Sequence, residues 1–360
     1  MNTWSSLLTG VIGGQDLTEG QARWVVEEIV TGAATSAQIA AIAVALRAKG
    51  ESPTEVRAFA DALVERSVPV PVDGKALDIV GTGGDQARTV NVSTMAAITA
   101  AACGRLVVKH GSRAASSACG TADVLEHLGV AIELDAAGVA EVARRAGISF
   151  CFAARFHRPL AHAAPARREI AIPTIFNFLG PLTNPARPRY VAAGVSRVAM
   201  GPLLAQVFAA RGVAALVFRG EDGLDEITVS ERTRVWRVTA DGTDEILFDP
   251  RDVGVALASR DALAGGDVRH NADVVRAVLS GAQQGPVRDA VLLNAAAGMT
   301  AAQPDAADLH TALADGMATA AEAIDSGAVL TTLDRWIEVS QEVGMTRAAS
   351  VRGSREPGPR

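Results

Sequence analysis

The first 67 residues place their apolar side chains at the spacing of α-helices. In the stretch 18–32, Trp24, Val25 and Ile29 belong to one apolar stripe, which begins after a threonine and a glutamine in capping-box spacing and ends before a glycine. The stretch 52–67 opens with serine, proline and, three positions after the serine, glutamate, a pattern typical of a capped helix start. These patterns predict a small helical unit that packs or dimerises.

From residue 75 onward, short apolar runs alternate with helical stretches. The runs predict strands over 76–80, 105–111, 130–134, 148–153, 189–195 and 214–220. Because strands that alternate with helices form parallel sheets covered on their faces, we expect the α/β class, with a mostly parallel central sheet flanked by helices. The stretch 235–249 departs from this alternation and predicts a hairpin that turns at Asp241 and Gly242.

Two interruptions of the pattern predict the domain boundaries. A link marked by proline and glycine covers 68–74, and the segment from about 157 to 189 consists of a helical stretch and loops punctuated by prolines. We expect residues 1–68, joined by about 157–189, to form a helical domain, and residues 75–156 and 190–343 to form the α/β domain. Residues 344–360 are polar and basic and contain glycine and proline, which predicts a disordered tail.

Charge and composition narrow the class of protein. The chain has 34 Lys and Arg against 40 Asp and Glu, a formal net charge of −6, which disfavours a nucleic-acid partner. Its three cysteines have no CxxC spacing, as expected of reduced thiols in a cytoplasmic protein. The N-terminus lacks the basic region of a signal peptide, and no apolar run has the ~18 residues that span a bilayer, so no membrane partner is expected.

A glycine-rich turn follows the first predicted strand of the α/β pattern. The sequence GTGGD at 81–85 allows a ligand to approach the backbone closely, but many strand-to-helix turns need glycine for backbone reasons alone. It is neither a Walker loop nor GxGxxG. Asn91, Ser93 and Thr94 stand where the next helix begins, and the free N–H groups and the dipole of a helix start suit phosphate. Phosphate binding and ordinary helix capping both remain open on these residues.

The loop 109–123 follows the next predicted strand and contains the cations Lys109 and Arg113 together with serine and threonine hydroxyls. Ligands of open α/β folds bind beyond the carboxyl ends of strands, so one anion can contact this loop and the glycine-rich turn. The alternative is a solvated basic loop.

Two further stretches contain charged candidates. Asp225 and Glu226 are adjacent carboxylates of the kind that bind Mg²⁺ together with substrate phosphates, although a surface acidic turn has the same composition. Arg167 and Arg168 lie on a predicted helix, where one of them can pair with a carboxylate.

In chain order, the sequence contains GTGGD, NVST, KHGxRxxSSxxGxAD, RRExxxxTIFNxLGPLTNPA and GLDE. Together these motifs resemble the anthranilate phosphoribosyltransferase family, from the N-terminal helices to about residue 340. The resemblance implies a helical and an α/β domain and a homodimer formed through the helical domains. It also implies Mg²⁺-dependent transfer of the phosphoribosyl group from phosphoribosyl pyrophosphate (PRPP) to the amine of anthranilate, with release of pyrophosphate, in tryptophan biosynthesis.

The resemblance also implies roles for individual residues. The residues implied to bind PRPP are Gly81, Gly83, Gly84, Asp85, Thr89, Asn91, Ser93, Thr94, Lys109, Ser116, Ser117 and Thr121. Mg²⁺ is implied to bind Ser93, Asp225 and Glu226. The acceptor is implied to contact Gly81, His110, Ser112 and Arg167. Lys109 and Arg167 are the implied catalytic residues: Lys109 stabilises the departing pyrophosphate and Arg167 faces the carboxylate of the acceptor.

Three positions depart from the family's pattern. Ser112 stands where asparagine is usual, Gln86 where glycine is usual, and Arg158 where proline follows the histidine. A serine hydroxyl is shorter than an amide and lacks its paired donor and acceptor. The PRPP motifs are whole, so the acceptor stays open between anthranilate and another aromatic carboxylate. A nucleoside phosphorylase and a non-catalytic nucleic-acid-binding relative are the remaining alternatives.

Overall fold

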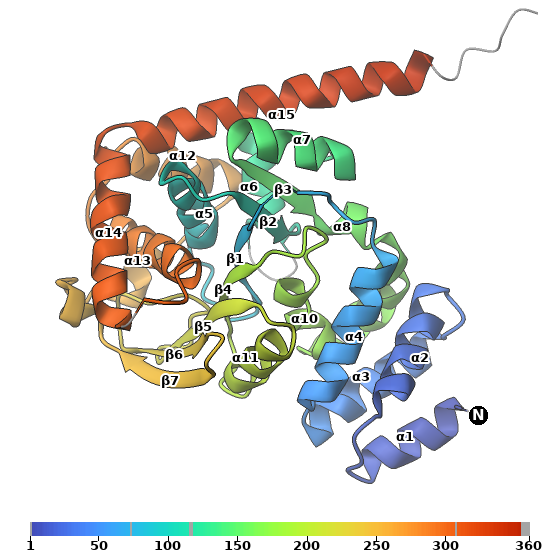
Figure 1. Ribbon diagram of the computed structural model, residues 1–360. Helices are drawn as coiled ribbons and strands as arrows, with labels where there is room; N and C mark the ends of the chain where they lie inside the picture. The colour runs from blue at the N-terminus through green and yellow to red at the C-terminus, as the bar shows by residue number, and fades with distance from the viewer. Residues whose placement is uncertain (1, 73, 115–117, 307, 354–360) are drawn as a thin grey trace, which may run out of the picture.

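The computed structural model describes residues 2–72, 74–114, 118–306 and 308–353. Over these residues, seven strands form one sheet in the order β3-β2-β1-β4-β5-β6-β7 (Figure 1). The first five strands in this order are parallel, and β6 and β7 continue the sheet as an antiparallel hairpin, as predicted. The strands are β1 (Leu77–Gly81), β2 (Val107–Gly111), β3 (Ile148–Phe152), β4 (Tyr190–Gly194), β5 (Ala214–Gly220), β6 (Thr233–Val238) and β7 (Thr243–Phe248).

The first four helices form the small unit at the lower right of Figure 1. They are α1 (Trp4–Ile12), α2 (Glu19–Val30), α3 (Ser36–Lys49) and α4 (Pro53–Arg66). The predicted capping boxes at the starts of α2 and α4 are both present. The cap glutamate Glu55 is fully buried, and its carboxylate accepts from the backbone N–H groups of Ser52 at 2.7 Å and Leu17 at 2.8 Å. One capping residue therefore also joins α4 to the loop before α2.

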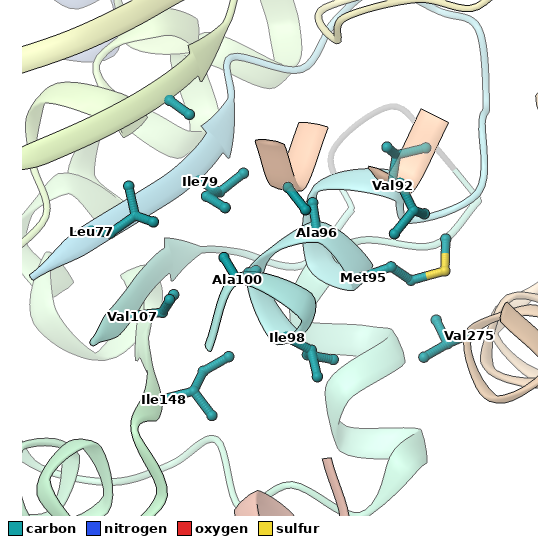
Figure 2. Packing of buried hydrophobic residues seen from close by; sticks show 14 of the residues in the cluster. Leu77, Ile79, Val92, Met95, Ala96, Ile98, Ala100, Val107, Ile148 and Val275 are labelled. Atoms are coloured by element: carbon teal, nitrogen blue, oxygen red, sulfur yellow. The ribbon is translucent and has the colours of Figure 1, made fainter. Parts of the chain in front are cut away.

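The remaining helices flank the sheet or connect its strands. Those of the α/β pattern are α5 (Val92–Ala102), α6 (Thr121–Leu128), α7 (Ala136–Ala146), α11 (Met200–Ala210), α12 (Val268–Leu279), α13 (Pro286–Ala301), α14 (Leu309–Asp325) and α15 (Ala328–Gly353), with the short turns η3 (Pro250–Val253) and η4 (Arg260–Leu263). Figure 2 shows α5 packed on the sheet, with Met95 and Ile98 on the helix and Ile79 on β1. None of the helices in the described part of the chain is long and apolar enough to cross a membrane.

The two faces of the sheet belong to two hydrophobic cores. On β1, Ile79 faces the core formed with α5 and α13, whereas its neighbour Val80 belongs to the core that contains α1–α4 and α11. On β5, Leu216 and Val217 divide in the same way. Because side chains of a strand alternate between its faces, the sheet itself joins the helical unit to the α/β layers.

The segment between β3 and β4 packs against the N-terminal helices. It contains α8 (Ala153–Phe156), η1 (Arg158–Ala163), α9 (Ala164–Ile170), α10 (Ile175–Phe178) and η2 (Gly180–Leu182). In this segment η1 contacts α2 and α9 contacts α3. Ala163, Ala166 and Ile175 are buried in the same core as α1–α4. The chain therefore crosses between the two cores twice within this segment, before α9 and after α10.

Two sequence expectations are wrong. Residues 130–134 are not a strand: Val130, Ile132 and Leu134 are buried, but the segment passes between α6 and α7 and pairs with no strand. The alternation of apolar residues predicted correctly that this segment is buried, but it predicted wrongly that the segment pairs with a strand. In the expected disordered tail, residues 344–353 are the last turns of α15 (red in Figure 1), while 354–360 lie outside the described residues.

Candidate active site

A cleft of about 550 Å³ lies where the carboxyl ends of the parallel strands face the segment between β3 and β4. Most of the predicted site residues line it: Gly81, Gly83, Gly84, Asp85, Thr89, Asn91, Ser93, Lys109, His110, Ser112, Thr121, Arg167, Asp225 and Glu226. Thr94 is fully buried behind this surface, and its hydroxyl has no hydrogen-bond partner in the described part of the chain. Ser116 and Ser117 lie outside the described residues.

Two glycines allow the acidic segment to approach the strand ends. Gly81 on β1 and Gly194 on β4 are register partners, and a Cβ on either would overlap Asp225. The Gly83 N–H donates to Asp225 Oδ2 at 2.7 Å. Gly81 was predicted from the sequence and Gly194 was missed, although a glycine at the end of a predicted strand was its signal.

The loop after the glycines contains residues in a conformation that favours glycine. Gln86 has φ +60° and Arg88 has φ +53°. Gln86 is the position where the related family usually has glycine, so the sequence departure coincides with a left-handed backbone. Ser196, which was not predicted from the sequence either, holds this loop from the other side: its hydroxyl donates to the Gly83 carbonyl at 2.9 Å, and its N–H donates to Thr82 Oγ1 at 3.2 Å.

The start of α5 has no side-chain cap. Asn91 is the N-cap residue, but its side chain makes no capping hydrogen bond. Instead Asn91 Oδ1 accepts from Asn271 Nδ2 at 2.9 Å, and its own Nδ2 donates to the Cys119 carbonyl at 3.4 Å. Capping by Ser93 or Thr94 is not seen either, because Ser93 Oγ accepts from Lys109 Nζ and the Thr94 hydroxyl has no partner in the described part of the chain. The helix start therefore remains available to an anion. Asn271 comes from α12, about 180 residues away, and no sequence pattern predicts its contribution.

Lys109 is a cation enclosed by protein. Its Nζ donates to the Ile79 carbonyl and to Ser93 Oγ, the latter at 3.2 Å, and its side chain is almost fully buried. Burial lowers the pKa of Lys109 to about 8, while Asp78, Asp225 and Glu226 oppose this shift by favouring the charged form. The amine is thus a preoriented positive group at the floor of the cleft.

The carboxylates beside Lys109 repel one another. Burial, followed by the charge of Asp85, raises the pKa of Asp225 to about 7, and burial together with Asp225 and Asp85 raises the pKa of Glu226 well above its usual range. Glu226 Oε2 is buried and has no hydrogen-bond partner in the described part of the chain. Asn294 fixes the following turn, because its side chain exchanges hydrogen bonds with both backbone groups of Ile227. A buried carboxylate pair with an unpartnered oxygen fits a bound cation.

No group of three His, Cys, Asp or Glu side chains in the described ranges is arranged to hold a metal ion. Mg²⁺ usually binds one or two carboxylates and completes its shell with substrate phosphates and water. Asp225 and Glu226 therefore fit an ion that arrives with a polyphosphate better than a permanently bound structural metal.

Asp123 on α6 holds Ala114 and Gly120, which lie on the two sides of residues 115–117. Asp123 Oδ2 accepts from the N–H groups of Ala114 and Gly120, both at 3.0 Å. Arg113 pairs with Asp123 and Glu126 and is exposed, so it is not the free cation that the loop composition indicated. Ser112 is also exposed, and its hydroxyl donates to the Arg113 carbonyl at 3.0 Å.

Arg167 faces the cleft from α9 on the opposite wall. Its guanidinium lies 5.8 Å from the centre of the Phe176 ring, and burial lowers its pKa. No carboxylate in the described ranges forms an ion pair with it. A partly buried guanidinium without a counter-ion fits a carboxylate ligand.

Two histidines join the walls of the cleft. His110 Nδ1 lies 2.9 Å from the Gly180 carbonyl, and His157 Nε2 lies 2.8 Å from the Thr183 carbonyl. Their rings meet edge to face at 5.2 Å. Burial lowers the pKa of His110 to about 3, so this ring is neutral and its Nδ1 carries the proton donated to the carbonyl.

Comparison with known proteins agrees with this architecture. Residues 5–67 match the helical bundle domain of the glycosyl transferase family, and residues 73–330 match its a/b domain. The anthranilate phosphoribosyltransferase of Acidothermus cellulolyticus is 57% identical over 340 residues, which cover 94% of this chain and 96% of that protein. The enzyme of Salinispora arenicola is 53% identical over 345 residues, which cover 95% of this chain and 98% of that protein.

Solved structures give the same result. The crystal structure of anthranilate phosphoribosyltransferase from Thermus thermophilus aligns with a TM-score of 0.86 and 38% identity, over 93% of this chain and 99% of that one. The enzyme from Saccharomyces cerevisiae in complex with PRPP and Mg aligns with a TM-score of 0.84 and 26% identity, over 94% and 98% of the two chains. The fold and the cleft thus define a glycosyl transferase with a helical-bundle domain and an a/b domain. Within that class, the chain belongs to the anthranilate phosphoribosyltransferase family.

Proposed function

We propose that this protein transfers the 5-phosphoribosyl group of PRPP to the amine of anthranilate and releases pyrophosphate. The observation that carries the proposal is the division of charge across one cleft. Lys109, the open start of α5 and the Asp225–Glu226 pair form one wall, which suits a polyphosphate with its cation. Arg167, a guanidinium without a counter-ion, stands on the other wall, which suits an acceptor with a carboxylate.

The donor side is assigned to residues on β1, β2 and α5. Residues 81–85 would bring backbone N–H groups to the phosphates, with Thr89, Asn91, Ser93 and Thr121 as hydrogen-bonding side chains. Asp225 and Glu226 would hold Mg²⁺, and Ser93 is the third proposed ligand. When bound, Mg²⁺ neutralises phosphate charge and stabilises the leaving pyrophosphate. Thr94 is buried and would support the helix start from within.

The reaction requires stabilisation of separating charge. As the bond between C1 of the ribose and pyrophosphate breaks, positive charge develops on the ribose and negative charge on the leaving group. Lys109 lies at a fixed position, held by the Ile79 carbonyl and Ser93, so little reorganisation is needed when this charge appears. The amine of an aromatic acid is neutral near pH 7 and can attack C1 directly when Arg167 orients its carboxylate.

The acceptor assignment includes His110 and Ser112 as well as Arg167 and Gly81. His110 is neutral and fixed by Gly180, so it offers a rigid wall rather than a charge. Ser112 is directed to the backbone of Arg113, and its short side chain leaves more room than asparagine would. This departure is why a different aromatic carboxylate is the second candidate acceptor.

We further propose that the enzyme acts in the cytoplasm as a homodimer.

The decisive experiment replaces Arg167 and its neighbour separately. Arg167→Ala is expected to lower kcat/KM for anthranilate by about 100-fold, because a charge-assisted pair worth about 2–3 kcal/mol is lost, and to leave the KM for PRPP within about twofold. Arg168→Ala is the matched control, since Arg168 is exposed on the same helix. Steady-state kinetics with each substrate varied in turn measure both constants.

Two outcomes would contradict the proposal. Equal effects of Arg167→Ala on anthranilate and on PRPP would remove Arg167 from the acceptor site. Intact PRPP binding by the unaltered protein without turnover of anthranilate would favour another aromatic carboxylate as acceptor.

A further inference from the structure

A second cavity of about 430 Å³, here called the back cavity, lies outside the catalytic cleft. Its lining comes from α4, from β4 and α11, and from the segment 181–189 that joins α10 to β4. Leu182 and Asn184 line the back cavity, whereas Gly180 and Thr183 of the same segment line the catalytic cleft. Residues 180–184 are therefore one wall shared by two cavities.

The apolar part of the lining of the back cavity contains one aromatic ring and two proline rings. Val64 lines it from α4, Val191 from β4 and Phe208 from α11, and Pro181 and Pro188 line it from the connecting segment. A volume of this size holds a small organic molecule, and pockets at the junction of structural units are common ligand sites. An aromatic ring and two proline rings in the lining favour an aromatic ligand over a flexible chain.

The charge at the rim of the back cavity is positive. Arg211 is fully engaged, by Asp61 at 2.5 Å and by the Leu182 carbonyl at 2.8 Å, and Glu65 pairs with Arg23. Arg187 and Arg189 are exposed at the rim, and no carboxylate in the described ranges forms an ion pair with either. Arg187 and Arg189 are therefore the two guanidinium groups of the lining without an ion pair in the described part of the chain, although the charge of Arg187 also contributes to lowering the pKa of Glu65, behind the larger effect of Arg23.

We propose that the back cavity binds a small aromatic carboxylate, with its ring against Phe208 and Pro188 and its carboxylate at Arg187 and Arg189. The site is separate from the catalytic cleft and does not depend on the function proposed for that cleft. Because Gly180 and Thr183 hold His110 and His157 on the far side of the shared wall, a ligand in the back cavity contacts the segment that positions both histidines.

The test uses 1-naphthoate as the probe and ligand-observed NMR titration of the full-length chain. All variants contain Arg167→Ala, which removes the guanidinium proposed to bind carboxylates in the catalytic cleft. For a ligand of this size we expect a Kd of about 1 mM. Adding Arg187→Ala with Arg189→Ala removes the rim charge, and adding Val64→Trp fills the cavity from α4; each is expected to raise the Kd at least tenfold.

Arg269→Ala is the matched control, because Arg269 is exposed on α12 and outside the back cavity. It should leave the Kd within twofold. Thermal unfolding shows whether the Val64→Trp chain folds. If it does not fold, the variant with Arg187→Ala and Arg189→Ala tests the proposal alone. Loss of binding on Arg167→Ala alone, relative to the unaltered chain, would overturn the proposal and place the probe in the catalytic cleft. Binding that survives both removal of the rim charge and filling of the cavity would also overturn it, because the probe would then bind outside the back cavity.

Discussion

Asp78 is a carboxylate on β1 without any contact with solvent. Its Oδ1 accepts from the His110 N–H at 3.2 Å, and its Oδ2 accepts from Asn184 Nδ2 at 2.9 Å. Asn184 also donates to the Val108 carbonyl at 2.7 Å. The pair therefore ties the segment between α10 and β4 to the two strands that lead to Gly81 and Lys109.

Because Asp78 is buried from solvent, the free energy of unfolding depends on pH in a defined direction. Burial raises the pKa of Asp78 from 3.8 to about 6, so the folded chain binds this proton more tightly than the unfolded chain. Stability associated with Asp78 is present below about pH 4 and is lost as pH rises towards 6, by up to about 3 kcal/mol. Asp78→Asn should make the fall between pH 4 and 6 smaller by this amount, while the part due to Asp225 and Glu226, whose pKa values are also raised, remains; the free energy of unfolding in urea at several pH values between 4 and 7 measures the difference.

Asp241→Asn is the control for this change, because Asp241 is exposed in the turn between β6 and β7. Its profile should run parallel to that of the unaltered chain. If the free energy of unfolding of the Asp78→Asn chain falls between pH 4 and 6 as much as that of the unaltered chain, burial of the Asp78 carboxylate does not contribute to this fall.

Gln86 gives a second residue-level prediction. Its φ of +60° strains a side chain with a Cβ but not glycine. Gln86→Gly is expected to raise the free energy of unfolding by about 0.5–1 kcal/mol, since relief of strain exceeds the added entropy of the unfolded chain. Gln303→Gly, at a loop position without positive φ, should lower it by a similar amount. Urea unfolding measures both, and equal destabilisation by the two changes would refute the strain at Gln86.

Among the secondary-structure elements, the segment 130–134 shows what a pattern of apolar positions leaves undetermined. Alternation predicted a strand, and the side chains are buried as alternation requires, but the partner is α15 rather than another strand. In a sheet, the Ala131 N–H would donate to a carbonyl of the neighbouring strand. Here it donates to Ser340 Oγ at 3.0 Å. Ser340 is fully buried.

Ser340→Ala should therefore destabilise the protein by about 1–2 kcal/mol, because the Ala131 N–H loses its acceptor. Ser326→Ala, which alters an exposed hydroxyl at the end of α14, should change stability by less than about 0.5 kcal/mol. Thermal or urea unfolding compares the two variants. A matching, small effect of both would mean that α15 does not hold the segment through this hydrogen bond.

The sequence also predicts only part of the candidate site. Residues 81–85, Lys109 and the Asp225–Glu226 pair could be found from sequence because each lies near or after the carboxyl end of a predicted strand, and parallel strands bring these ends together. Asn271 and Ser196 could not, because each acts on the site through hydrogen bonds to residues distant in sequence: Asn271 to the N-cap residue Asn91, and Ser196 to Thr82 and Gly83. Arg113 was counted among the cations of a loop that an anion can contact, because composition does not reveal that Asp123 and Glu126 neutralise it.

At the scale of the whole molecule, the arrangement of the two hydrophobic cores determines which apolar surface is left for contact with a second subunit. One face of the sheet is covered within the α/β layers, and the other is covered by α11 and the helical unit. The outer surface of that unit retains exposed apolar side chains, Ile12 at 75% and Val44 at 39% of their accessible area. They lie on α1 and α3, which pack together, and Trp4 and Leu8 on α1 are only partly buried.

This surface is where we expect the proposed homodimer to form. Ile12→Glu combined with Val44→Glu places two charges in the expected interface, and desolvation of unpaired carboxylates should convert the dimer to a monomer at micromolar concentration. Light scattering after size exclusion gives the mass. Leu257→Glu is the matched control, since Leu257 is 44% exposed but lies on the α/β side of the molecule, and it should leave the dimer intact. A monomeric unaltered chain would refute the dimer itself. A dimer that withstands both charges would place the interface elsewhere, because α1 and α3 cannot bury two unpaired carboxylates in an interface without losing affinity.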